Sequence, residues 1–303
     1  MTRACGLGSG ALALLLLLGT VGSAGAHGFA GARFFPATLT TDDPFVADEL
    51  SLPTVSFFNN PASGDSPSSH ETDFAVEFSK VIFPHFGLSV NETLIHLAPQ
   101  GDKAHTAFGN LGVGGKYELL VNGPHEAIVS VGLDAELGGT GRASVGADSF
   151  STLTPGVFFG KGMGDLPDAA MYLKPFAVTG VLGVSFPTNN SIPNALQWGL
   201  ALEYSLPYLQ AQVKDVGLPA WVNRLIPLVE FSFQSPLNRG GGQTTGTINP
   251  GLLWAGKYLQ LGVEALIPVN AASGHNVGVI AQLHFYLDDL FPAFFGKPLF
   301  GGK

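Results

Sequence analysis

The chain has 303 residues, of which 46% are hydrophobic and only 12% are charged. The charged fraction is about half that of an average soluble domain, and the hydrophobic fraction is too high for a disordered chain. Acidic residues outnumber basic ones by 23 to 14 and no basic run occurs, so we exclude nucleic acid as a partner. A helical membrane protein is also excluded, because no run of about 18 apolar residues follows the N-terminus.

The first 26 residues have the three parts of a secretory signal peptide. Arg3 supplies positive charge, residues 11–18 (ALALLLLL) form an apolar stretch too short to span a bilayer, and residues 23–26 (SAGA) suit cleavage. The alternative is a buried N-terminal helix. We predict export, with a mature chain that begins at His27. Cys5, the only cysteine, leaves with the signal peptide, so the mature chain has no thiol for disulfides or metal binding.

Residues 27–49 show neither the period of two that marks a strand nor helical periodicity. We expect an irregular N-terminal extension on the periplasmic side. Its aromatic residues Phe34, Phe35 and Phe45 make it the segment most suited to enter or cap a lumen.

From residue 50 to residue 287, runs of about ten residues with alternating character recur between clusters of turn residues. In residues 257–267, for example, Leu259, Leu261 and Val263 alternate with Gln260 and Glu264. Because neighbouring side chains of a strand point to opposite sides, one face suits lipid and the other suits water. The twelve predicted strands are 50–58, 73–80, 86–97, 110–120, 126–137, 149–161, 171–186, 196–206, 225–234, 247–254, 257–267 and 276–287.

The connections alternate in length, which is typical of outer-membrane barrels. Two connections are longer than this pattern requires, residues 162–169 and 207–223, and a short helix is expected at residues 209–221. We predict an all-β fold, a transmembrane antiparallel β-barrel of about 12 strands in the Gram-negative outer membrane, with both termini periplasmic and a C-terminal tail at residues 288–303. A soluble β-sandwich is the alternative, but its solvent face should carry many charges, whereas the polar face here is rich in Gly and Gln. The long connections are 59–71, 99–105, 138–148, 187–194, 235–246 and 268–275, and the short ones lie near 84, 122–124 and 256.

Glycines recur inside the predicted strands, and we interpret them as sites of bending and close packing that help to close a cylinder. Aromatic residues near the strand ends suit a girdle at the membrane interface, with ordinary core packing as the alternative. Those aromatic residues are Phe57, Phe58, Phe83, Phe86, Tyr204, Tyr208, Trp254 and Tyr258.

On the inner face, acidic side chains outnumber basic ones. In a wet pore they would favour cations or neutral polar solutes, whereas in a dry lumen they would have to pair or take up protons. A barrel of about twelve strands lies between filled eight-stranded barrels and wide porins, so both interpretations stay open, with a narrow or gated conduit preferred. The residues assigned to the lumen are Glu77, Lys116, Glu118, Asp134, Glu136, Glu203, Glu230, Glu264 and His284, with Lys174 as a further cation.

No catalytic motif, cofactor motif or zinc-binding spacing of histidines is present. Signal cleavage would expose His27, whose amino group and imidazole make it a weak candidate for copper binding. A membrane enzyme could still pair a serine with a histidine across strands, and His96 with Ser89 or His284 with Ser205 are the conceivable pairs. We predict no catalytic residue and no cofactor.

Residues 111–119 (LGVGGKYEL) and 256–264 (GKYLQLGVE) resemble strands of the outer-membrane barrel proteins of the meta-pathway phenol-degradation type, which are transporter-like. The resemblance in residue character extends over residues 50–287. The two ends, residues 27–49 and 288–303, look like those of a distinct proteobacterial subgroup of uncharacterised proteins. The resemblance implies an outer-membrane location and passive transport, and it carries no functional residues.

The sequence therefore predicts an outer-membrane passive channel for small polar or aromatic solutes. Its partners would be outer-membrane lipid and those solutes, and its oligomeric state is open. One alternative is a non-conducting barrel that binds a ligand or supports the envelope. The other is an outer-membrane lipid-modifying enzyme.

Overall fold

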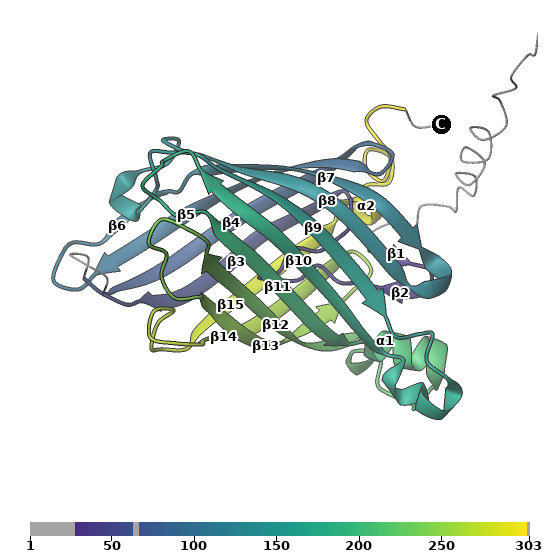
Figure 1. Ribbon diagram of the computed structural model, residues 1–303. Coiled ribbons are helices and arrows are strands. Elements are labelled where there is room, and N and C mark those ends of the chain that lie inside the picture. The colour runs from purple at the N-terminus through teal and green to yellow at the C-terminus, as the bar shows by residue number, and fades with distance from the viewer. Residues whose placement is uncertain (1–27, 63–66, 302–303) are drawn as a thin grey trace, which may run out of the picture.

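The computed structural model describes residues 28–62 and 67–301 and has the form of a closed antiparallel barrel (Figure 1). Each long strand pairs with the next along the chain, and β15 pairs with β3 to close the cylinder. The prediction of an all-β antiparallel barrel of about twelve strands is confirmed. The barrel strands are β3 (Glu49–Asn60), β4 (Ser69–Phe83), β5 (Phe86–Pro99), β7 (Leu111–Asn122), β8 (Ala127–Leu137), β9 (Thr152–Gly162), β10 (Phe176–Pro187), β11 (Ala195–Tyr204), β12 (Leu225–Pro236), β13 (Thr245–Ala255), β14 (Leu259–Pro268) and β15 (Gly278–Tyr286).

The fourth strand of the barrel is longer than its alternation indicates. β6 (His105–Phe108) pairs with the second half of β5, and β7 pairs with the first half. The two are separated at Gly109, whose N–H still donates to the carbonyl of Thr93 at 2.8 Å. The alternation restarts after this irregularity, which is why the sequence placed His105 in a connection.

Six predicted strands begin one to five residues later than expected, and in two of them a turn accounts for the late start. Glu126 has a left-handed backbone with φ of 48° and ends a short 3-10 turn, η1 (Gly123–His125), so β8 starts at the next residue. Met171 belongs to another turn, η3 (Asp168–Leu173), and β10 starts at Phe176. In both places turn hydrogen bonds replace the strand ladder, although apolar residues extend the alternating pattern.

The helix expected at residues 209–221 is present only in part. α1 (Leu206–Tyr208) runs into a π-helix, η4 (Leu209–Val213), which ends where Lys214 becomes extended. The chain turns at Gly217, with φ of 70°, before the 3-10 turn η5 (Val222–Arg224). The remaining short helices are η2 (Ala143–Val145) and α2 (Leu287–Leu290). Within the described ranges, no helix has both the length and the apolar character needed to cross a lipid bilayer.

The strands have two different faces. On β14, Leu261 and Val263 are each 48% exposed on the outside, whereas Gln260 and Glu264 are buried inside. The outer face carries a row of apolar side chains of this kind around the cylinder, as lipid requires. The inner face carries the polar and charged side chains and most of the strand glycines.

The barrel has two distinct ends. At one end, which we call the terminal end, β3 begins and β15 ends, and β1 (Phe29–Ala30) and β2 (Arg33–Phe34) lie there too (Figure 1). The opposite end, the loop end, carries the connections that include residues 138–151 and 237–244. After α2 the tail returns to β4, where the Leu299 and Phe300 N–H groups donate to the Val81 and Ile82 carbonyls.

Candidate functional site

Residues 28–48, called here the N-terminal segment, lie against the inner face of β9–β14, called here the packed wall. Three inward glycines make room for it. A Cβ built on Gly199 would lie 2.9 Å from the Thr41 side chain, and one on Gly262 would lie 2.6 Å from Leu39. Gly160 has the same relation to Phe35, at 3.1 Å. These glycines therefore serve close approach of the segment, a role that the sequence interpretation, bending of the strands, did not include.

The tip of the segment is held by one carboxylate, that of Glu230 on β12. The carboxylate accepts the backbone N–H groups of Leu39 at 2.7 Å, Thr40 at 3.0 Å and Thr41 at 2.6 Å. The Thr40 hydroxyl donates a fourth hydrogen bond at 2.7 Å. Hydrogen bonds to a charged acceptor are about twice as strong as neutral ones, so Glu230 fixes the tip firmly.

The side of the segment that faces β7 and β8 is held by both signs of charge. Lys116 pairs with Asp42 at 2.9 Å and donates to the Asp43 carbonyl, while Glu118 accepts the Val46 N–H at 2.9 Å. Burial raises the pKa of Asp43 to about 7, although the positive charge of Lys116 opposes the shift. The Ser130 hydroxyl on β8 donates to the Pro44 carbonyl at 2.5 Å.

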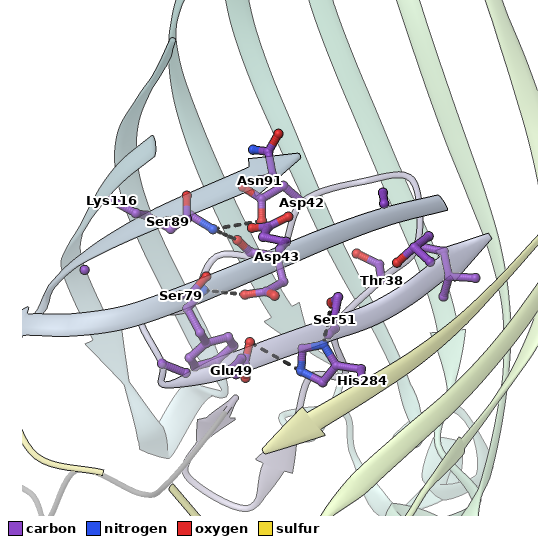
Figure 2. Close-up of a pocket in the computed structure, with 18 of the residues that line it drawn as sticks. Thr38, Asp42, Asp43, Glu49, Ser51, Ser79, Ser89, Asn91, Lys116 and His284 are labelled. Carbon is purple, nitrogen blue, oxygen red and sulfur yellow. Dashed lines mark hydrogen bonds and ion pairs between the residues drawn. The ribbon is translucent and has the colours of Figure 1, made fainter. Parts of the chain in front are cut away.

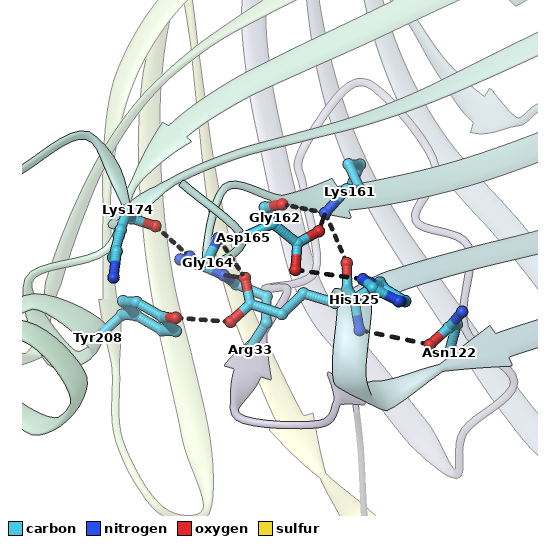
Figure 3. Close-up of polar contacts among 10 residues, drawn as sticks. Arg33, Asn122, His125, Lys161, Gly162, Gly164, Asp165, Lys174 and Tyr208 are labelled. Carbon is cyan, nitrogen blue, oxygen red and sulfur yellow. Dashed lines mark hydrogen bonds and ion pairs between the residues drawn. The ribbon is translucent and has the colours of Figure 1, made fainter. Parts of the chain in front are cut away.

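A buried arginine anchors the segment at the terminal end (Figure 3). Arg33 is fully buried and pairs with Glu126 at 3.2 Å, and its Nη1 donates to the Pro175 carbonyl at 3.0 Å. Its guanidinium lies 3.6 Å from the ring centre of Tyr208, whose hydroxyl donates to Glu126 at 2.6 Å. Burial, together with that hydrogen bond to Glu126, raises the pKa of Tyr208 to about 12.

The other end of the segment is anchored by Asp48. Its carboxylate accepts the Val81 N–H at 2.6 Å, the Lys80 ammonium at 2.7 Å and the Gly296 N–H at 2.7 Å. The segment is therefore tied at both of its ends and at its tip, and it fills the packed side of the lumen toward the terminal end.

Across the lumen, the inner face of β3–β5, called here the hydroxyl wall, borders a cavity of about 450 Å³ (Figure 2). Gly112 and Gly114 on β7 leave space that the Asn91 side chain and those of Ser89 and Asp134 fill. The Glu77 carboxylate lines the same cavity. The hydroxyl and amide groups that line this wall are Ser51, Thr54, Ser79, Ser89, Asn91 and Thr93.

A second cavity, of about 460 Å³, lies toward the loop end and is lined by inward residues of β9–β13 such as Thr154, Gln197 and Thr247. The two cavities share lining residues, among them Asp42 and Asp134. They therefore adjoin at the tip of the N-terminal segment.

The structure places the sequence-predicted lumen residues in different surroundings rather than in one ring. Lys116, Glu118 and Glu230 bind the N-terminal segment, and Glu77 and Asp134 line the first cavity. Four further residues are placed as follows: Glu203 and Glu264 are buried in the packed wall, Glu136 accepts from the Asn110 amide near the loop end at 2.9 Å, and Lys174 pairs with Asp168 at the terminal end. His27 lies outside the described residues.

His284 takes a different partner from the one considered in the sequence. Its Nδ1 lies 2.9 Å from the Ser51 hydroxyl, and its Nε2 lies 3.5 Å from the Glu49 carboxylate, across the seam where β15 meets β3. His96 bonds to Thr106 at 2.7 Å. In the described ranges neither His284–Ser205 nor His96–Ser89 forms a hydrogen bond.

Sequence reasoning missed the groups of the segment that bind the barrel: Arg33, Asp42, Asp43 and Asp48. One signal was present for Arg33, which is the only Lys or Arg between positions 27 and 79 and lies among apolar neighbours. The acidic residues of the segment gave no pattern of their own. In the described part of the chain, no group of three or more His, Cys, Asp or Glu side chains is arranged to hold a metal ion.

Solved structures share this fold at low sequence identity. The COG4313 outer membrane channel from Pseudomonas putida F1 is 11% identical, with a TM-score of 0.52 over 84% of this chain and 99% of that one. The KdgM porin is 12% identical, with a TM-score of 0.46 over 78% and 98% of the two chains. LpxR from Salmonella typhimurium is 10% identical, with a TM-score of 0.45 over 78% and 99%. No family model and no curated protein sequence matches the chain.

The COG4313 channel agrees with the expected resemblance at the level of the outer-membrane β-barrel fold. The finer assignment to the meta-pathway phenol-degradation type stays a prediction.

Proposed function

We propose that this protein is a passive outer-membrane channel whose lumen is narrowed by its own N-terminal segment. The observation that carries the proposal is the one-sided packing of the segment. It covers the part of the packed wall toward the terminal end and leaves two adjoining cavities, one of about 450 Å³ along the hydroxyl wall and one of about 460 Å³ at the loop-end part of the packed wall. A solute gradient would supply the driving force, so no catalytic residue is needed.

We propose that the terminal end faces the periplasm. Short turns at residues 84–85 and 256–258 lie at that end, whereas all six connections at the loop end are longer than these two. Outer-membrane barrels have short periplasmic turns and longer external loops, which supports this orientation. It also places both anchors of the N-terminal segment on the periplasmic side.

The lining of the path favours small polar solutes, neutral or cationic, over anions. Passage of aromatic solutes, which the sequence also predicts, remains a prediction. Hydroxyl and amide groups such as Ser89 and Asn91 offer hydrogen bonds, and Glu77 and Asp134 add negative charge. Lys116 is the basic residue beside them, and its charge is matched by Asp42. A net negative path concentrates cations by electrostatic attraction.

Reversal potentials in a planar bilayer under a salt gradient test this proposal. The Glu77→Gln/Asp134→Asn variant should lose most of the cation preference, because both carboxylates border the path. The matched control, Glu203→Gln, removes a carboxylate buried in the packed wall and should keep the preference. The absence of any current across the bilayer would refute the channel function. Equal effects of the two variants on the reversal potential would refute the assignment of the path to the cavity lined by Glu77 and Asp134.

A second candidate function, an acyl hydrolase, is favoured by one observation. Ser51, His284 and Glu49 are arranged as nucleophile, base and carboxylate, and all three line the first cavity. A fluorophosphonate probe that labels the folded protein, but not its Ser51→Ala variant, would support the hydrolase. The channel proposal predicts no label at Ser51, where the contacts serve to close the β15–β3 seam.

A further inference from the structure

Three carboxylates lie behind the N-terminal segment on the packed wall. Glu203 extends from β11, Glu230 from β12 and Glu264 from β14, and each is no more than 1% exposed. The Glu264 side chain lies over Gly251 of β13, at the position that a side chain there would occupy. The glycine therefore lets Glu264 extend toward Glu230, the residue that holds the tip of the segment.

The three carboxylates differ sharply in their hydrogen bonding. Glu230 accepts four hydrogen bonds from the segment, whereas no N–H group and no Ser, Thr or Tyr hydroxyl of the described residues donates to either oxygen of Glu203 or Glu264. The charged groups that act on Glu203 are Arg33 and Glu230, and Arg33 is already paired with Glu126. The group that acts on Glu264 is the Glu230 carboxylate, which has the same sign and lies close enough to accept a hydrogen bond from Glu264 when Glu264 carries a proton.

An ionised carboxylate buried without a hydrogen bond or a counter-ion is too costly to persist, and a neighbouring negative charge adds to the cost. A proton removes the charge and needs no additional space. We propose that Glu203 and Glu264 are two buried proton-binding sites, each occupied while the N-terminal segment is seated on the packed wall.

Seating of the segment is then linked to pH. When the segment leaves, water reaches both carboxyl groups, which give up their protons to it at neutral pH. The seated state binds more protons than the released state, so seating is favoured at low pH and weakens as the pH rises. The consequence for conduction, a wider path at high pH, rests on the proposed channel function, whereas protonation and seating do not.

Infrared spectroscopy of the folded protein in detergent at pH 7 tests the protonation directly. A protonated carboxyl group absorbs apart from an ionised carboxylate, so Glu203→Gln and Glu264→Gln should each remove intensity from that absorption. Glu118→Gln is the matched control, because both oxygens of Glu118 have a partner, the Val46 N–H at 2.9 Å and the His85 Nδ1 at 2.9 Å. If neither substitution changes the absorption of protonated carboxyl groups, the proposal is overturned. It is also overturned if the wild type lacks that absorption, because a bound cation would then be the neutralising group.

Thiol labelling tests the link to seating without any measurement of current. Thr41 belongs to the tip and is buried against the packed wall, so Thr41→Cys reports release of the segment. We compare its labelling rate with the rate in a Glu203→Gln/Glu264→Gln background at the same pH, which cancels the pH dependence of the thiol itself. The ratio should be about one at pH 4, below the pKa of about 4.3 of a water-exposed Glu, and should rise up to about tenfold per pH unit for each proton lost above that pH. A ratio that stays at one up to pH 9 would overturn the link.

Discussion

The two walls of the lumen differ in what lies against their inward polar side chains. The packed wall puts glycines and buried carboxylates against a peptide segment, and one of these carboxylates, Glu230, binds the amides of Leu39, Thr40 and Thr41. The hydroxyl wall puts short side chains such as Ser89 and Asn91 against a cavity. Alternation along the strands is the same in both. The role of an inward side chain therefore depends on whether the segment or a cavity lies opposite it. Substitutions on each side of the lumen test this difference.

The largest effect is expected at the anchor of the packed side. Arg33→Leu leaves Glu126 buried without its charge partner, and breaking a buried pair in this way costs about 3–5 kcal/mol. The segment should then be released, which limited proteolysis of the folded protein would detect as cleavage within residues 28–48. Lys161→Leu is the control, because it breaks an exposed pair with Asp165. Equal resistance of the Arg33 variant and the wild type would contradict the anchoring role.

A smaller effect is expected from filling the space beneath the segment. Gly199→Ala places a Cβ 2.9 Å from Thr41, and overpacking of this kind costs about 1–3 kcal/mol. Gly156→Ala is the matched control, because the nearest atom to its Cβ lies at an ordinary 3.5 Å. Urea titrations in lipid vesicles would measure both free energies of unfolding. Similar losses in the two variants would mean that Gly199 does not make room for the segment.

The smallest effect concerns Asp43, whose pKa is raised to about 7 by burial. A raised pKa means that the seated segment holds this proton more tightly than a water-exposed Asp, whose side chain loses its proton at about pH 3.9. The contribution to seating is complete below that pH and is lost as the pH rises through about 7. In the Glu203→Gln/Glu264→Gln background, Asp43→Asn should remove the residual pH dependence of Thr41→Cys labelling. An unchanged profile between pH 5 and pH 8 would exclude Asp43 as its source.

The sequence predicts the barrel well because strand alternation is a local property. Leu261 and Glu264 can be assigned to opposite faces from their own neighbours alone. The irregularities depend on backbone turns, such as the left-handed Glu126, that polarity patterns do not encode. The partners within the lumen are non-local, so nothing near Glu230 in the sequence indicates that it binds residues 39–41. The same limit explains why Gly199 and Gly262 were interpreted through the strand that contains them rather than through the segment that they accommodate.

We propose that solutes pass through the two adjoining cavities while the N-terminal segment stays on the packed wall. A disulfide tests this most directly. In Thr41→Cys/Gly199→Cys the new sulfur and the new Cβ would lie about 3 Å apart, as a disulfide requires. We predict that oxidation at pH 6 locks the segment and leaves the single-channel current and its cation preference unchanged. A current that disappears on oxidation and returns on reduction would contradict the account.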